Sequence, residues 1–356
     1  ARGRDLHTAG RMMAAPIRVL VVDDSAYIRK VIREMLSRSQ DLEVVGTARD
    51  GEDALRQVEE LRPDVVTCDL IMPGMDGVEF IRRQMAIQPV PIVVVSIAPE
   101  SSERVLMALD AGAVDFVQKP TALASERVLE IADELAGKLR VAAAAPVARF
   151  GQPAVVTAAP VAATFRNRYD VVVVGVSTGG PQGLRVVVPR LPADFPLPIA
   201  IVLHMPVGYT DAYARRLDEL SAVSVREASD GERLMPGVAV IAPAGRHLVF
   251  DRDASGHVRT RLEMRPLDSL HRPSVDVLFQ SAAAIYGDRV LALVMTGMGE
   301  DGRQGAAWIK AKGGTVLTEA EESCIVYGMP RAVVEAGLSD ASVRLEQLAE
   351  AVMERV

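Results

Sequence analysis

The sequence predicts an α/β protein built from two doubly wound parallel-sheet domains in tandem. Strand-like and helix-like segments alternate strictly over residues 17–140, and the alternation begins again at Tyr169. Such alternation is typical of parallel sheets with helices on both faces, because a parallel crossover usually returns through a helix. Between the two regions, residues 141–168 are rich in alanine and proline and carry little charge, which indicates a linker.

Length and composition limit the class of protein. The chain has 356 residues, which fits two domains of ordinary size. A net charge of −7 gives no electrostatic basis for binding nucleic acid, and no apolar run approaches the ~20 residues of a membrane span. Two cysteines, Cys68 and Cys324, argue against a disulfide framework and fit a reducing cytoplasm. We expect a disordered leader (1–15), a first domain (16–140), a linker (141–168) and a second domain (169–356).

Five predicted strands alternate with five predicted helices in the first domain. The strands are expected at residues 17–21, 42–48, 63–70, 91–97 and 113–118. The helices are expected at 25–38, 52–61, 76–87, 103–112 and 123–140. In the first helix the apolar residues recur at the spacing of one helical face, namely Ile28, Val31, Ile32, Met35 and Leu36.

The second domain repeats the pattern with one interruption. Strands are expected at 171–176, 198–204, 289–296 and 315–318, with helices near 181–190, 209–220 and 274–286, another after residue 296, and one at the C-terminus. Residues 230–250 differ, because their short apolar segments are separated by Pro-Gly and Ala-Gly pairs. Short apolar segments separated by such turn residues predict β-hairpins added to the sheet.

Acidic residues follow the strands of the first domain. Asp23 and Asp24 end the first strand and Asp69 ends the third, while Ser96 and Lys119 end the fourth and fifth. The carboxyl ends of parallel strands meet at one edge of a sheet. Clustered carboxylates need a cation, and oxygen ligands suit Mg²⁺. Any one of these acids alone would more often be a helix cap, but their common place at strand ends, together with the lysine, favours a phosphoryl acceptor among them.

The second domain has the features of a serine esterase. "GVSTG" is a G-x-S-x-G sequence between a strand and a helix, so Ser177 is a candidate nucleophile. The N–H groups that follow, beginning with Thr178, lie at a helix N-terminus and can stabilise an oxyanion. His204 ends a strand and Asp301 follows one, so both should reach the same sheet edge as base and orienting acid. His271, just before a predicted helix, could cap it or contact substrate.

Two alternative functions remain open from these patterns. Gly297, Gly299 and Gly302 form a G-x-G-x-x-G loop with Glu319 placed as a ribose-binding acid, which is typical of dinucleotide sites. Glu300 and Asp301 oppose that hypothesis, because a pyrophosphate would meet two negative charges in the loop. Alternatively, the second domain is a non-catalytic interaction module. The serine, histidine and aspartate of the apparent triad would then only be residues that are common in turns.

Residues 17–138 resemble the receiver domains of bacterial two-component response regulators, which have a flavodoxin-like fold. The resemblance rests on "VVDDSAYIR", "CDLIMPGMDG", "VVVSI" and "DFVQKP". It implies phosphorylation of Asp69 by a histidine kinase, with Mg²⁺ bound by Asp23, Asp24, Asp69 and the Ile71 carbonyl. It also implies that Ser96 and Phe116 form the switch pair and that Lys119 contacts the phosphate. Ile97 is bulkier than the residue usual there, and we expect it to slow access to the phosphate.

The tandem as a whole resembles the chemotaxis protein-glutamate methylesterase (CheB) family. The matching motifs are "VGVSTGGPQGL", "LHMPVGYT", "EASDGERLMPGVAVIAPAGRHL", "HRPSVDVLF", "TGMGEDGRQG" and "ESCIVYGMPR". The resemblance implies Ser177 as nucleophile, His204 as base, Asp301 as orienting acid and the Met298 N–H as an oxyanion donor. It implies hydrolysis of glutamate γ-methyl esters on chemoreceptors, and deamidation of glutamine, with no cofactor for the esterase.

The two-domain architecture also indicates regulation. We expect the unphosphorylated first domain to cover the Ser177 edge, and phosphorylation of Asp69 to shift the region of Ser96 and Phe116 and loosen the contact. The partners implied are methyl-accepting chemoreceptors as substrate and a histidine kinase as phosphodonor, in the cytoplasm. Neither nucleic acid nor membrane insertion is expected.

Overall fold

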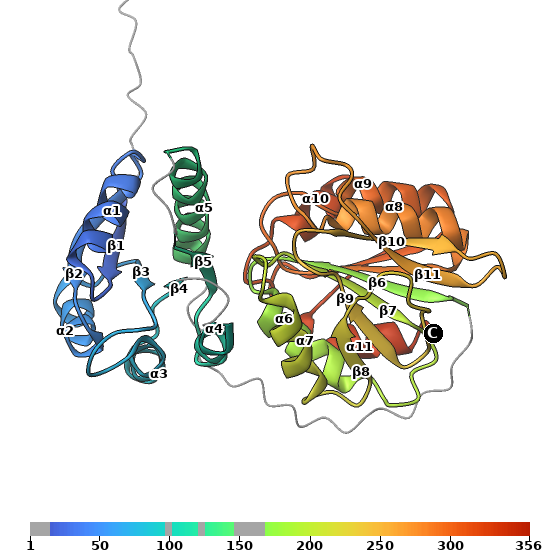
Figure 1. Cartoon of the computed structure of the whole chain (residues 1–356), viewed down its shortest axis with the longest axis horizontal. Coiled ribbons are helices and arrows are strands. Elements are labelled where there is room, and N and C mark those ends of the chain that lie inside the picture. The colour runs from blue at the N-terminus through green and yellow to red at the C-terminus, as the bar shows by residue number, and fades with distance from the viewer. Residues whose placement is uncertain (1–14, 97–101, 120–124, 146–167) are drawn as a thin grey trace, which may run out of the picture.

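The computed structural model describes residues 15–96, 102–119, 125–145 and 168–356. The chain contains two parallel sheets, one in each half, and each sheet is the central layer of an α/β domain with helices on both faces (Figure 1). The predicted fold class is therefore confirmed. Most of the expected leader and linker, together with Ile97 and Pro120, lie outside the described residues, and residues 141–144, assigned to the linker, continue the preceding helix.

The first sheet has the strand order β2-β1-β3-β4-β5, with every pairing parallel. Its strands are β1 (Ile17–Val22), β2 (Leu42–Ala48), β3 (Val65–Cys68), β4 (Ile92–Ser96) and β5 (Asp115–Gln118). The helices are α1 (Ala26–Leu36), α2 (Gly51–Leu61), α3 (Gly77–Ile87), α4 (Ser102–Asp110) and α5 (Ser125–Ala144). Ser25, Asp50 and Asp76 cap the first three helices by accepting a hydrogen bond from the N–H three residues on, which explains why these helices begin there.

The second sheet has the order β14-β13-β12-β6-β7-β9-β8 and is also parallel throughout. Its strands are β6 (Val171–Val176), β7 (Ile199–Leu203), β8 (Ser224–Glu227), β9 (Val238–Ile241), β12 (Val290–Val294), β13 (Thr315–Glu319) and β14 (Ala341–Val343). Its helices are α6 (Gly180–Val187), α7 (Thr210–Asp218), α8 (Val275–Tyr286), α9 (Arg303–Ala311), α10 (Met329–Glu335) and α11 (Leu345–Met353), with short 3-10 turns η3 (Val188–Arg190) and η4 (Gly287–Arg289).

Helices cover both faces of the second sheet. Val171 and Val173 of β6 pack with Leu278 and Phe279 of α8, while Val172 and Val174 point to the opposite face, in the same core cluster as Leu184 of α6 and Leu348 of α11. Figure 1 shows α8, α9 and α10 on one side and α6, α7 and α11 on the other. A strand buried on both faces must be apolar at every position, which explains the run of four valines. None of the helices in the described ranges combines the length and apolarity needed to cross a membrane.

The region that interrupts the alternation, residues 230–250, contains one strand of the main sheet, β9, and the beginning of one hairpin. β10 (His247–Arg252) and β11 (Val258–Glu263) form an antiparallel hairpin, but it is a separate two-stranded sheet, and its turn lies between Arg252 and Val258 and not at the Pro-Gly or Ala-Gly pairs on which the prediction rested. β9, within the same predicted hairpin region, instead joins the main sheet in parallel with β7 and β8. β8, β14 and α10 are short elements that the sequence pattern did not indicate.

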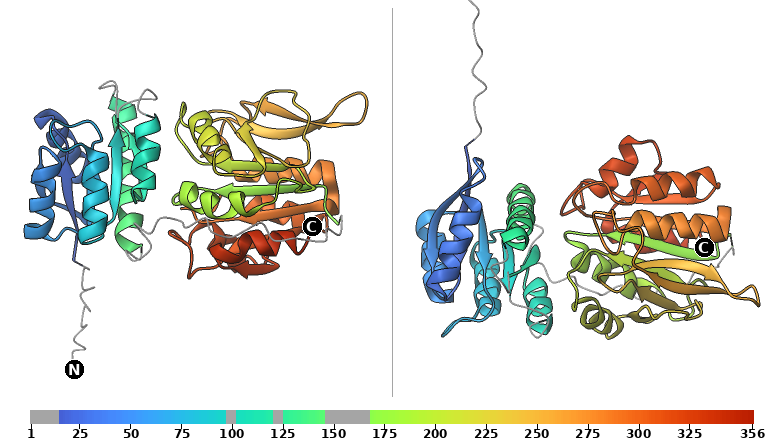
Figure 2. Two further views of the ribbon diagram at one scale, coloured as in Figure 1. Left: turned by 90° about the horizontal axis from the view of Figure 1, so that it is seen from below. Right: turned by 45° about the horizontal axis from the view of Figure 1, so that its top comes forward.

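The two domains are in contact, with α4 and α5 of the first facing the second (Figure 2). α4 packs against both α6 and α7. Buried apolar residues of the first domain and of one face of the second sheet form a contiguous cluster, which includes Phe116 and Tyr209. Their rings lie 4.7 Å apart, centroid to centroid.

Candidate active site and phosphorylation site

The candidate nucleophile lies in a tight turn between β6 and α6. The Ser177 carbonyl accepts the Gly180 N–H at 2.6 Å, and the Ser177 N–H donates to the Thr296 carbonyl at 3.0 Å. Gly179 has a left-handed φ of 78°, and a Cβ there would lie 2.8 Å from the side chain of Ile325. Only glycine meets both demands, so the turn that presents Ser177 depends on it.

Three neighbouring strands bring the candidate triad together. β6 lies between β12 and β7, and Val176 is opposite Leu203 while Gly175 is opposite Val294. His204 therefore emerges beside Ser177 on one side, and the loop that carries Asp301 emerges on the other. The strand order changes direction at this point of the sheet, which is where open α/β sheets bind ligands.

His204 is oriented by Asp301. The Nε2 atom of His204 lies 2.9 Å from Oδ2 of Asp301, and both side chains are less than one-tenth exposed. With the proton on Nε2, Nδ1 is the basic atom. Nδ1 of His204 is buried without a hydrogen-bond partner in the described chain, so it is free to accept a proton. The Ser177 hydroxyl does not bond to it in this structure, and such bonds commonly form only with substrate.

The Asp301 carboxylate is held ionised by donors around it. Oδ1 accepts the Ser274 hydroxyl and the Asp276 N–H, both at 2.9 Å, and Oδ2 also accepts the Val275 N–H at 2.8 Å. Burial opposes ionisation, but the hydrogen bond with His204 and those from the backbone lower the pKa of Asp301 far below its usual range. These donors lie at the N-terminus of α8, where the helix dipole favours an anion.

Asp276 is a second buried acid in this region. It accepts the N–H groups of Gly302 at 2.9 Å and Gly305 at 2.7 Å, and so fixes the start of α9. Burial raises the pKa of Asp276 to about 6, and the charge of Asp301 adds to that rise. Asp276 thus connects the Asp301 loop to α8.

Two backbone N–H groups are available as oxyanion donors. Those of Thr178 and Met298 donate to no backbone acceptor in the described residues. Between them, Gly297 approaches so closely that a Cβ there would lie 2.7 Å from Cβ of Ser177. Glu300, the extra acid of this loop, is 63 % exposed and pairs with Arg303 at 3.2 Å, so its charge is directed to solvent.

His271 is a site residue whose role the sequence left undecided. Its ring stacks on that of His204 at a centroid distance of 4.2 Å and an angle of 22°. Burial, followed by the charge of His204, lowers the pKa of His271 to about 4. It is therefore a neutral ring that limits the rotation of His204. Only its position before a predicted helix, in "HRPSVD", pointed to it.

The first domain contacts the nucleophile turn directly. Oδ2 of Asp115 accepts the Thr178 hydroxyl at 2.7 Å, and the Ala113 carbonyl accepts Nε2 of Gln182 at 2.6 Å. Asp115 is in turn paired with Lys138 of α5 at 3.1 Å. The sequence predicted that the first domain covers the Ser177 edge, but not these particular contacts, because they join residues 63 and 69 positions apart in the chain.

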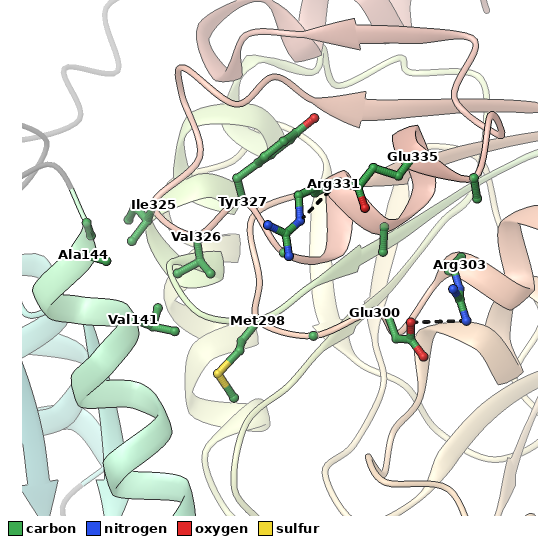
Figure 3. Close-up of a pocket in the computed structure, with 15 residues that line it drawn as sticks. Val141, Ala144, Met298, Glu300, Arg303, Ile325, Val326, Tyr327, Arg331 and Glu335 are labelled. Carbon is green, nitrogen blue, oxygen red and sulfur yellow. Dashed lines mark ion pairs between the residues drawn. The ribbon is translucent and has the colours of Figure 1, made fainter. Parts of the chain in front are cut away.

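A groove lies beside the oxyanion loop, between α5 and the second domain (Figure 3). It has a volume of about 840 Å³ and is lined by Val141 and Ala144 on one side and by Met298 and Tyr327 on the other. Cε of Met298 lies 3.5 Å from the position of a Cβ on Gly137. α5 therefore packs close to the loop that carries one of the proposed oxyanion donors.

The acids predicted in the first domain do converge. Carboxylate oxygens of Asp23, Asp24 and Asp69 lie within 4.8 Å of one another. Nζ of Lys119 lies 2.6 Å from Asp23 and 2.8 Å from Asp69. Burial raises the pKa of Asp23 and the charge of Asp69 adds to it, while Lys119 lowers it. Three carboxylates, of which Asp24 is exposed to solvent, fit Mg²⁺, because this ion keeps several of its waters when bound.

Both predicted switch residues are buried. Ser96 is 1 % exposed and its carbonyl accepts the Lys119 N–H at 2.7 Å, which ties the switch region to the acidic cluster. Phe116 is 2 % exposed and packs on Tyr209 of the other domain. The aromatic member of the pair thus lies in the interdomain contact.

The fold and site together define a class of protein, a receiver domain joined to a serine-esterase-like α/β domain. Comparisons agree. Family models match CheB methylesterase over residues 172–352 and the response regulator receiver domain over residues 19–131. A protein-glutamate methylesterase/protein-glutamine glutaminase of Myxococcus xanthus is 53 % identical over 338 residues, covering 94 % of this chain and 96 % of its own.

Further relatives extend the agreement. A Geobacillus kaustophilus protein of the same name is 45 % identical and covers 96 % of this chain and 99 % of its own. The crystal structure of the Thermotoga maritima CheB methylesterase catalytic domain matches with a TM-score of 0.51 and 42 % identity, over 52 % of this chain and 98 % of that one. The chain belongs to the CheB methylesterase family.

The predicted family, enzyme class and function, a receiver-linked methylesterase, are thereby confirmed. The two alternatives, a nucleotide-binding loop and a non-catalytic module, are not supported. In the structure the Gly297 N–H donates to the Val326 carbonyl at 3.0 Å, so it is not free to bind a phosphate. Receiver domains in general are phosphorylated with the help of Mg²⁺ by a kinase, and that much extends to this chain.

Proposed function

We propose that the chain hydrolyses glutamate γ-methyl esters on chemoreceptors, and deamidates glutamine there, with Ser177, His204 and Asp301 as its catalytic residues. The observation that carries this proposal is the His204–Asp301 hydrogen bond at 2.9 Å, which leaves Nδ1 of His204 as a free base next to the Ser177 turn. The functional units proposed are residues 16–140 and 169–356, and the place of action is the cytoplasm, where the receptor glutamates lie.

The chemistry follows that of a serine hydrolase. Ser177 attacks the ester carbonyl while Nδ1 of His204 takes the hydroxyl proton, and Asp301 stabilises the resulting imidazolium. The N–H groups of Thr178 and Met298 bind the negative oxygen of the tetrahedral intermediate. His204 returns the proton to the leaving methoxide, and methanol departs. Water then attacks the acyl-enzyme by the same route and releases glutamate.

The first domain is proposed to restrain this site until it is phosphorylated. Asp69 accepts the phosphoryl group from a histidine kinase, and Lys119 is placed to contact it. Asp23, Asp24, Asp69 and the Ile71 carbonyl would hold Mg²⁺, which supplies positive charge for the incoming phosphate. Movement of Phe116 away from Tyr209 would carry Asp115 with it and free the Thr178 hydroxyl, because Asp115 and Phe116 are adjacent in β5.

Methanol release from methylated receptor membranes tests these roles. Wild type, Ser177→Ala and Asp69→Asn are compared with and without Mg²⁺ and a small phosphodonor. Release is expected to require Ser177 and to rise with phosphodonor only when Asp69 is present. Near-normal release by Ser177→Ala would refute the triad, and stimulation of Asp69→Asn would refute the phosphorylation site.

The restraint by the first domain has its own test. A fragment beginning near Arg168 is expected to release methanol faster than the unphosphorylated full chain, because it lacks the contacts to Thr178 and Gln182. Equal rates, from a fragment with the circular dichroism of a folded α/β protein, would remove the inhibitory role.

A further inference from the structure

Glu319 is a buried acid without a role in the chemistry above. It is the last residue of β13, next to β12, and is 0 % exposed. Its Oε2 accepts the Thr296 N–H at 2.8 Å, and its Oε1 lies 3.2 Å from Oγ of Ser323. No lysine or arginine in the described part of the chain forms an ion pair with it. Burying a carboxylate without a cation costs free energy of folding. The presence of an acid at this position therefore needs an explanation.

Its hydrogen-bond partner, Thr296, links the two loops of the active site. The Thr296 carbonyl accepts the Ser177 N–H at 3.0 Å, and its hydroxyl donates to the Thr178 carbonyl at 3.0 Å. The same hydroxyl accepts the Val326 N–H at 2.9 Å. Thr296 also lies only two residues before Met298. Glu319 therefore fixes the residue on which both oxyanion donors depend for their position.

The surroundings of Glu319 accommodate a proton without rearrangement. Oγ of Ser323 lies 3.1 Å from the Ala320 carbonyl and accepts the Leu345 N–H at 2.9 Å. If Glu319 is neutral, its Oε1–H donates to Oγ of Ser323, whose own hydrogen turns to the Ala320 carbonyl. If Glu319 is ionised, the Ser323 hydroxyl donates to Oε1 instead. Every hydrogen-bonding group is satisfied in both cases.

The charged groups nearby favour the neutral form. The pKa of Glu319 is raised to about 7, mainly by burial and also by the charge of Glu346 at the start of α11. The hydrogen bonds from Thr296, Ser323 and Cys324 act in the opposite direction and lower it. The titratable groups of the proposed active site, Asp301 and His204, follow β12 and β7 and are hydrogen-bonded to each other. The buried thiol of Cys324 also lies beside Glu319, with its Sγ 3.8 Å from the Glu319 backbone carbonyl oxygen.

We propose that Glu319 is a positioning residue for ester hydrolysis, which holds the 295–299 loop through the Thr296 N–H and does so as the neutral acid. This inference rests on the catalytic roles proposed above. A neutral acid fixes the loop without adding negative charge beneath the place where the oxyanion forms. Ionisation of Glu319 would oppose that charge, so turnover should fall as Glu319 loses its proton.

The test is the pH profile of kcat for the full chain, measured without phosphodonor so that the first domain is in one state throughout. Glu319→Gln keeps the shape and the acceptor for Thr296, and its amide can donate to Ser323, yet it cannot ionise. The ratio of kcat for Glu319→Gln to that of wild type is expected to rise several-fold, roughly three- to tenfold, between about pH 6 and about pH 9. Ser177→Ala serves as the blank for spontaneous ester hydrolysis.

A second variant tests the positioning itself. Glu319→Ala is expected to lower kcat at least about tenfold with little change in KM, because the loop position matters to the transition state more than to substrate binding. A constant ratio of Glu319→Gln to wild type across the pH range overturns the role of the neutral acid, even if Glu319→Ala fails to fold. Normal kcat in a folded Glu319→Ala overturns positioning. Activity remaining in Ser177→Ala would instead refute the proposed nucleophile.

Discussion

Replacing Asp110 by alanine is expected to activate the enzyme without phosphorylation. Asp110 ends α4 and pairs with two arginines of the other domain, Arg185 on α6 and Arg216 on α7. The pair with Arg185 is about one-fifth exposed on both sides, whereas Arg216 is 46 % exposed and also pairs with Glu219. The Arg216 pair should therefore contribute little.

The magnitude follows from that exposure. An exposed ion pair contributes ~0.2–1 kcal/mol, and a partly buried one more, so the two together should stabilise the closed arrangement by about 1.5 kcal/mol. Losing this amount shifts the equilibrium toward the open arrangement by about tenfold. The contacts of Asp115 with Thr178 and of Phe116 with Tyr209 remain, so the shift should be partial.

Methanol release without phosphodonor, at saturating substrate, measures the effect. Asp110→Ala should show a rate about tenfold above wild type and a correspondingly smaller stimulation by phosphodonor. Arg82→Ala is the matched control, because it removes an ion pair with Glu79 on α3 within the first domain. An unchanged rate for Asp110→Ala, or an equal increase for Arg82→Ala, would show that the interdomain ion pairs do not restrain the site.

Three further predictions follow from individual contacts. Gly297→Ala should lower the free energy of unfolding by ~1–3 kcal/mol and reduce kcat, because its Cβ would lie 2.7 Å from that of Ser177; urea unfolding and methanol release measure the two effects. The raised pKa of Glu319, about 7 against an ordinary value of 4.5, means that the native state binds the proton more tightly, so stability should fall as pH rises between those values. Urea unfolding over that range should show less of this fall in Glu319→Gln, and an identical slope would contradict the assignment. Chelation of Mg²⁺ should abolish stimulation by a phosphodonor but not the unstimulated release, since only the Asp69 site requires the ion.

Local patterns in the sequence were sufficient for the fold class and the candidate triad. Alternating strand and helix segments require parallel crossovers, and residues at the carboxyl ends of parallel strands must share an edge. Ser177, His204 and Asp301 each follow a strand, so their convergence needed only that the three strands be neighbours. The short elements β8, β14 and α10 were missed because a few residues give too little periodicity.

The longer strands and helices, the sheet edge at which the candidate residues lie and the types of those residues thus followed from the sequence alone. Which groups surround the candidate residues depends on the tertiary fold. The stacking of His271 on His204, the contact of Asp115 with Thr178 and the bond from Thr296 to Glu319 join residues 23 to 67 positions apart. Such contacts depend on strand order and domain packing, which place segments side by side by long-range burial of apolar surface, and no local pattern carries that information.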